Sequence, residues 1–124
     1  MRTPSRTLTE QELEIMKVVW GLERATVRDV YEVLRERRQI AYTTVMTMMN
    51  ILETKKYLKK QAQDRAYIYR ATRPRSEVIK AMVRDFLDRV FNGSAEPLLV
   101  QLIKDRQLSK KDLEKIARTI KDVE

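Results

Sequence analysis

The stretch that most constrains the fold is 41–52, AYTTVMTMMNIL, because its twelve residues carry no charge in a chain in which 35% of residues are charged. Its apolar residues recur at i, i+3, i+4 and i+7, the spacing that places side chains on one face of a helix. They are Val45, Met48, Met49 and Leu52. The pattern predicts a helix over about 42–55 that packs this face against a core.

The other face of the predicted helix carries short, uncharged side chains, while the sequence around the helix is basic. Its residues are Thr43, Thr44, Met46, Thr47 and Asn50. Over 35–73, ten basic residues stand against three acidic ones, a net charge of +7 in a chain of net charge +8. A neutral helix between cations is typical of a protein that inserts a helix into a nucleic-acid groove. A buried helix in a basic protein would give the same pattern.

The composition limits the chemistry that the chain can perform. It has no cysteine and no histidine, which excludes the usual zinc, copper and iron–sulfur sites, and catalysis by a cysteine nucleophile or a histidine base. Two glycines are too few for a phosphate-cradling loop, and with only three prolines they predict a mainly α fold. We therefore expect no metal, no cofactor and no enzymatic activity.

Capping signals divide the N-terminal half into helices. Thr9 with Glu12, and Thr26 with Asp29, have the spacing of capping boxes and predict two helix starts. Gly21 predicts the end of the first helix, in the left-handed conformation. The second helix, a short turn and the neutral helix then form a helix-turn-helix.

The segment after the neutral helix has the pattern of a hairpin. Two short runs, 57–63 and 66–71, flank Asp64 and Arg65, and the second run alternates tyrosines with other residues. Three helices followed by a hairpin predict a winged helix-turn-helix DNA-binding domain over 1–73. Arg65 is then at the tip of the wing, where it faces a phosphate or a minor groove.

The chain after Pro74 predicts a separate helical domain over 74–124. Ser76, Ser94 and Ser109 are the expected caps of three helices, and 92–93 separates the first two. Helices of this size cannot bury their apolar stripes alone. A second copy of the chain is the expected partner, with a six-helix monomer as the alternative. The predicted dimer interface comprises Ile79, Met82, Val83, Phe86, Leu87, Val90, Leu98, Leu99, Leu102, Leu113, Ile116 and Ile120.

The N-terminus predicts neither a signal peptide nor a membrane span. Residues 1–8 are polar and contain two arginines that are candidates for phosphate contact, and no run of about 18 apolar residues occurs in the chain. A cytoplasmic location is therefore expected. The high pI, near 9.9, favours an anionic partner, either nucleic acid or an acidic membrane surface.

Taken together, these segments resemble the penicillinase-repressor family (BlaI, MecI and relatives) along nearly the whole chain. The resemblance is carried by LTEQELEIMKVVW (8–20), TVRDVYEVL (26–34), AYTTVMTMMNIL (41–52) and RAYIYRA (65–71). The C-terminal segments VFNGS, LLVQLIKD and LSKKDLEKI, within 90–116, match the family's dimerisation half. The copper-responsive branch of the family carries a cysteine-rich tail, and this chain has no cysteine.

The resemblance implies a transcriptional repressor that binds a palindromic operator as a homodimer. It implies that the threonines and Met46 face the major groove and that Arg65 lies at the wing. The residues predicted to contact DNA are Tyr42, Thr43, Thr44, Met46, Thr47, Asn50, Lys55, Lys60 and Arg65. Family members are commonly inactivated by a membrane-bound sensor protease that detects β-lactams, and the aligned bond here is Gln101–Leu102, where well-known members have Asn–Phe.

The residue types also suggest a base preference and leave other functions open. Threonine and methionine suit thymine methyls and adenine edges, so half-sites containing A·T pairs are expected, and Asn50 is a candidate for an adenine contact. One alternative is a regulator that binds a small molecule near Met82 and Phe86. Others are a protein–protein module, which the charge excess at 35–73 opposes, and a carboxylate enzyme, for which the scattered acids are unsuited.

Overall fold

The computed structural model describes residues 8–106 and 108–123, which form two compact units that divide after Met82. The first unit contains α1 (Glu10–Leu22), α2 (Val27–Arg35), α3 (Tyr42–Thr54), β1 (Leu58–Gln63) and β2 (Ala66–Ala71). The chain continues through α4 (Arg75–Phe91), α5 (Glu96–Arg106) and α6 (Lys110–Val123). This mainly helical architecture confirms the predicted fold class.

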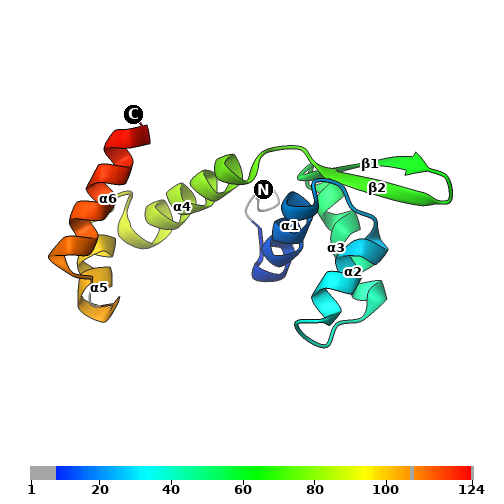
Figure 1. The fold of residues 1–124 in the computed structure, drawn as a ribbon, viewed down its shortest axis with the longest axis horizontal. Helices are drawn as coiled ribbons and strands as arrows, with labels where there is room; N and C mark the ends of the chain where they lie inside the picture. Colours follow the sequence, from blue (N-terminus) through cyan, green and yellow to red (C-terminus); the bar gives the residue numbers. More distant parts are fainter. Residues whose placement is uncertain (1–7, 107, 124) are drawn as a thin grey trace. The chain divides into compact units, whose positions relative to one another are not determined.

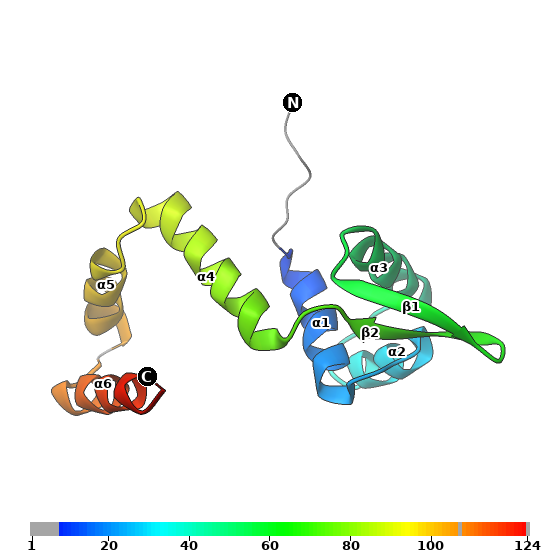
Figure 2. The same ribbon diagram turned by 90° about the horizontal axis from the view of Figure 1, so that it is seen from above.

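The hairpin of the first unit is the wing of a winged helix-turn-helix. β1 and β2 are antiparallel, with Leu58 opposite Ala71 and Gln63 opposite Ala66. Ala25 adds a third strand position by exchanging two backbone hydrogen bonds with Tyr69, of 2.8 and 3.0 Å. The tip of the hairpin projects beyond α1, α2 and α3 in both Figure 1 and Figure 2.

Both predicted capping boxes of this unit are present. The Thr9 hydroxyl accepts from the Glu12 N–H at 3.1 Å, and the Glu12 carboxylate accepts from the Thr9 N–H at 2.8 Å. Thr26 and Asp29 exchange the same pair of bonds, each 3.0 Å long. These bonds satisfy backbone donors that a helix N-terminus otherwise leaves without partners.

The predicted end of the first helix was wrong by two residues. Gly21 is helical, and Glu23 instead adopts the positive φ of 71° and donates its N–H to the Val19 carbonyl at 2.8 Å. The chain leaves the helix there because Ala25, two residues further on, pairs with Tyr69 in the sheet.

The core of the first unit is formed by fourteen buried apolar residues from every one of its elements. Val45, Met49 and Leu52 of α3 are fully buried, as the spacing predicts, whereas Met48 is only half-buried at the margin. Val78 of α4 also belongs to this core, because it is 3% exposed and packs among the same residues.

Two of the three predicted serine caps of the C-terminal helices were wrong. α4 begins at Arg75, so that Ser76 lies inside the helix, and α5 begins at Glu96, two residues beyond Ser94. The Ser109 box is present, since Ser109 and Asp112 exchange bonds of 3.0 and 3.1 Å. Asn92 and Gly93 end α4 with φ of 53° and 83°, as expected.

The second unit lacks a core among its described side chains. None of them is buried, and six of the predicted interface residues are largely exposed: Val83, Phe86, Val90, Leu99, Ile116 and Ile120. The other six are half-buried; Leu87, Leu98, Leu102 and Leu113 belong to this unit, and Ile79 and Met82 belong to the first. The compact units divide inside α4, where Val78 packs on the first core. The predicted boundary between a DNA-binding domain, 1–73, and a dimerisation domain, 74–124, stays a prediction.

Candidate nucleic-acid interface

The outward face of α3 is exposed and free of charge. Tyr42 and Met46 are 37% and 40% exposed, large values for side chains of this size. The remaining polar members of the face are also exposed: Thr43, Thr44, Thr47 and Asn50. Hydroxyls, methyls and one amide are therefore accessible on the side of α3 that faces away from the core.

A groove of about 350 Å³ lies where this face meets α2 and the hairpin. Five residues predicted to contact DNA line it: Tyr42, Met46, Asn50, Lys60 and Arg65. Thr43, Thr44, Thr47 and Lys55 are not among its lining residues. The groove has cations on two sides, because Arg28 of α2 lines it as well as Lys60 and Arg65 of the hairpin.

Tyr42, the first residue of α3, is held by two side chains of α2. The Arg28 guanidinium lies over its ring, 5.3 Å from the centroid, and the Tyr31 ring packs edge-on at 5.5 Å. A cation over a ring face and an edge-on aromatic pair are both favourable arrangements. They fix Tyr42 at the start of the exposed face.

The hairpin contributes two tyrosines to the groove. The Tyr67 ring, 51% exposed, lies under the Lys60 ammonium at 4.6 Å, and Lys60 also lies 3.8 Å from a Glu53 oxygen. Tyr69 is 2% exposed, and its hydroxyl donates to Asn50 Oδ1 at 3.1 Å. The hairpin is thus joined to α3 by a side-chain hydrogen bond.

Lys55 occupies a different environment from the other predicted DNA-contacting residues. Its ammonium lies 2.9 Å from Glu12 Oε1, and the two side chains are 21% and 4% exposed. Burial of the Glu12 carboxylate works against ionisation, but the Thr9 N–H and Lys55 outweigh it and lower the pKa of Glu12. Lys55 therefore balances a buried charge between α1 and α3.

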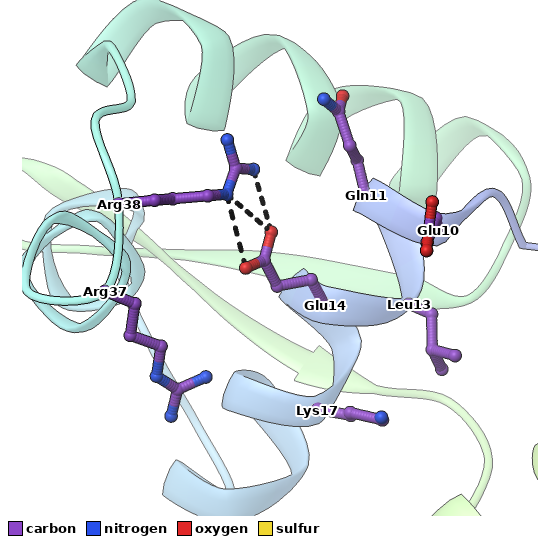
Figure 3. A pocket seen from close by; sticks show the side chains of 7 residues that line it. All are labelled: Glu10, Gln11, Leu13, Glu14, Lys17, Arg37 and Arg38. Atoms are coloured by element: carbon purple, nitrogen blue, oxygen red, sulfur yellow. Dashed lines mark hydrogen bonds and ion pairs between the residues drawn. The ribbon is translucent and has the colours of Figure 1, made fainter.

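Half of the ten basic residues of 35–73 have acidic partners. Figure 3 shows the clearest case: the Arg38 guanidinium binds both oxygens of Glu14 at 2.8–3.3 Å, fastening the turn before α3 to α1. Within the described part of the chain, five have no ion-pair partner: Arg37, Lys56, Lys59, Arg65 and Arg70. Three of these flank or belong to the hairpin strands and one is at its tip, so uncompensated positive charge is concentrated there.

Sequence reasoning missed Tyr67 and Tyr69 as residues of the groove. The alternation of Tyr67 and Tyr69 signals a strand, but it does not reveal that Tyr69 reaches Asn50, nineteen residues earlier. Within 8–106 and 108–123, no group of three acidic side chains is arranged to hold a metal ion, and no helix is long and apolar enough to span a membrane. The two arginines of the N-terminal arm lie outside the described residues.

The fold and this exposed helix define a winged helix-turn-helix regulator, and comparison with known proteins gives its family. Residues 8–122 match the penicillinase repressor family. The chain therefore belongs to this family of transcriptional repressors, as the resemblance implied.

Curated relatives agree with this assignment. The transcriptional regulator BlaI of Mycobacterium tuberculosis is 35% identical over 98 residues, covering 77% of this chain and 71% of the relative. The penicillinase repressor of Bacillus licheniformis is 24% identical over 115 residues, covering 93% of this chain and 90% of the relative.

Two solved structures resemble this chain over 61% of its length. The DNA-binding domain of the repressor BlaI has a TM-score of 0.54 at 24% identity, over 61% of this chain and 93% of that one, a likeness of fold. Monomeric Bacillus licheniformis BlaI in complex with the blaP half-operator has a TM-score of 0.51 at 25% identity, over 61% of this chain and 90% of that one.

Proposed function

We propose that this chain represses transcription by binding a near-palindromic operator as a homodimer. The observation that carries the proposal is the exposed, uncharged face of α3 beside a groove with cations on two sides. A helix of this kind fits the major groove, and the cations suit the phosphates beside it. The BlaI half-operator complex supports the same use of the fold. In this proposal 1–73 binds DNA and 74–124 mediates dimerisation.

The face of α3 favours A·T pairs. Thr43, Thr44 and Thr47 present hydroxyls and methyls, and Met46 presents a flexible apolar side chain. These groups suit thymine methyls, and no arginine lies on α3 to make the usual bidentate contact with guanine. Lys60 and Arg65 contact the phosphates or enter the minor groove. Lys55 acts through Glu12 rather than on DNA directly.

Dimerisation is supported by the exposed apolar stripes of the second unit. Val90 and Ile120 are 54% and 56% exposed, and Val83 is 48% exposed. Covering these half-exposed side chains removes apolar surface from water and stabilises association by roughly half of the 1.5–3 kcal/mol that full burial of such a side chain contributes. A second copy of the same stripes supplies a matching apolar surface, as two-fold symmetric dimers require.

Release from DNA by proteolysis fits the position of Gln101–Leu102. The bond lies in the middle of α5, where Gln101 is exposed and donates to Asp105 at 2.6 Å, and Leu102 is half-buried. Cutting there separates α6 from α4 and weakens the dimer. Two linked half-site contacts then become independent, and the affinity gained from their linkage is lost. The protease in this proposal is a membrane-bound sensor of cell-wall antibiotics.

A small-molecule-responsive regulator is the second candidate, favoured by one observation. An open groove of about 680 Å³ between α1 and the start of α4 is lined by Leu13 and Ile79 with Lys17, Arg75 and Lys80 around them. Apolar walls with a cationic rim suit an amphiphilic anion. In this candidate such a ligand, and not proteolysis, lowers operator affinity.

Selection from a random DNA library tests the proposed function. The expected product is a near-palindrome with half-sites about one helical turn apart that contain A·T pairs. Thr44→Ala and Met46→Ala should each relax the preference at a different position, whereas Lys111→Ala in α6 should change none. Selected sequences without symmetry, or with guanine contacts alone, would contradict the proposal.

A further inference from the structure

A hydrogen bond between the wing and α3 controls which part of Asn50 faces the groove. The Tyr69 hydroxyl donates to Asn50 Oδ1 at 3.1 Å, and both residues line the groove. Within the described residues, the amide nitrogen of Asn50 has no protein partner. The side chain therefore has its acceptor engaged by the wing while its two N–H donors remain available.

Both the ring and the backbone of Tyr69 are held in place by the rest of the first unit. Its ring is 2% exposed within the core, and its backbone is held by both hydrogen bonds to Ala25. Burial raises the pKa of the Tyr69 hydroxyl, with smaller contributions from Glu53, Tyr67 and Tyr42, so the group stays protonated and able to donate at neutral pH. The phenol is consequently a fixed donor at the floor of the groove.

An asparagine without such a partner does not distinguish hydrogen-bond donors from acceptors on a base edge. It can turn its amide over and present either an acceptor or a donor, and the bidentate contact with adenine uses both at once. The Tyr69 hydroxyl occupies one of the two acceptor positions of Oδ1 and fixes the amide, so the adenine N6 donor has to compete with the phenol for this oxygen. Acceptors on a base edge, namely N7 of adenine, N7 and O6 of guanine or O4 of thymine, meet the two free N–H donors.

We propose that Tyr69 is a positioning residue that makes Asn50 a reader of hydrogen-bond acceptors. The base that Asn50 faces is then one with an acceptor on its edge, guanine or thymine above adenine, and cytosine, which offers only its N4 donor, is rejected. This inference rests on the proposed function and changes one detail of it, because the bidentate adenine contact expected of Asn50 is reduced to a single hydrogen bond at N7. The wing thus contributes to base selection through α3, without itself touching the base.

The test measures base preference at each operator position for the full-length protein and its variants. Duplexes carrying all four base pairs at each position of a selected half-site are titrated with wild type, Tyr69→Phe, Asn50→Ala and the double variant. In wild type we expect one position to prefer guanine or thymine over cytosine by about fivefold, the scale of one net hydrogen bond. Asn50→Ala abolishes that preference, and Tyr69→Phe reduces it to within about twofold, with the affinity for adenine now increased because Oδ1 is free to accept from its N6.

The informative quantity is the ratio of affinities for two duplexes that differ at one base pair. If Tyr69 only stabilised the fold, Tyr69→Phe would not change this ratio. A variant that is partly unfolded binds every duplex less well by the same factor. The double variant should match Asn50→Ala, since Tyr69 acts only through Asn50. Asn50→Asp keeps an acceptor for the phenol but removes both donors, so it should reverse the preference toward cytosine. Tyr67→Phe removes a hydroxyl from the same strand and should leave all preferences unchanged.

The possible failures are distinguishable. If wild type prefers a sequence but Tyr69→Phe retains the full preference at the Asn50 position, the inference is overturned and the proposed function stands. The same holds if Asn50→Ala changes no position. If wild type shows no base preference anywhere, the proposed function fails, and the inference fails with it.

Discussion

The two units of this chain differ in how their apolar residues are covered. The first has fourteen buried apolar side chains in one core, whereas no described side chain of the second is buried. Both units are nonetheless built from amphipathic elements of similar length. The difference indicates that the first unit is stabilised by its own interior, and it is the reason for proposing that the second is covered by another copy of the chain.

The difference also fits the roles proposed for the two units. A self-sufficient core can hold Tyr42, Asn50 and Tyr69 in fixed positions, which base recognition requires. A unit whose stability depends on association is suited to control, because any change that loosens it alters how two DNA-binding units are linked. The following predictions test this division in order of decreasing effect.

The largest effect is expected from a charge placed in the exposed stripe of the second unit. Val90→Asp puts a carboxylate at a position that is 54% exposed in one chain and that the proposed dimer covers. An unpaired charge at such a site costs several kcal/mol, so the dimer dissociation constant should rise by more than about 100-fold in sedimentation equilibrium. Lys104→Asp, at an exposed polar position of α5, is the control. An unchanged mass for Val90→Asp would refute the interface.

The next prediction compares the same kind of truncation in both units. Leu52→Ala opens a cavity at a fully buried site of α3 and should lower the free energy of unfolding by about 3 kcal/mol. Leu99→Ala removes a side chain that is 46% exposed and should change mainly the dimer affinity. Trp20, the single tryptophan, lies in α1 and reports urea unfolding of the first unit alone. Equal losses in the two variants would remove the distinction between the units.

A third prediction concerns the buried ion pair of the first unit. The pKa of Glu12 is lowered below its ordinary 4.5, so its charge stabilises the fold at neutral pH, and this contribution disappears as the pH falls through the lowered value. Glu12→Gln should cost about 1–2 kcal/mol at pH 7 and progressively less below about pH 4.5. Glu10→Gln, at an exposed position of the same helix turn, should show neither effect. A constant difference across this range would contradict the assignment.

The smallest expected effect belongs to the tip of the wing. Arg65→Ala should weaken operator binding about fivefold, equally for all sequences, and reduce the slope of log K against log salt by about one. Lys111→Ala removes the same charge from α6 and serves as the control. A sequence-dependent loss would instead mean that Arg65 contacts bases.

The elements that could be predicted from the sequence are those fixed by neighbouring residues. The capping boxes at Thr9, Thr26 and Ser109, the core face of α3 and the hairpin around Asp64 all depend on residues within a few positions of one another. Such signals act through local backbone geometry, so they remain valid whatever the rest of the chain does.

The features that could not be predicted depend on contacts between distant segments. The ion pair between Lys55 and Glu12 joins residues 43 positions apart, and periodicity carries no information about such a pair. Gly21 was expected to end α1, but the sheet contact of Ala25 sets where the chain turns. The bond from Tyr69 to Asn50 is of the same kind.

The most direct test of the account is the mass of the DNA complex, measured by light scattering across a salt titration on a selected operator and on its scrambled version. We predict two chains on each operator, preferential binding over the scrambled duplex, and a slope of log K against log salt of about −6 to −9. One chain for each duplex, or equal and salt-insensitive binding to both, would contradict the division into a DNA-binding unit and a dimerising unit.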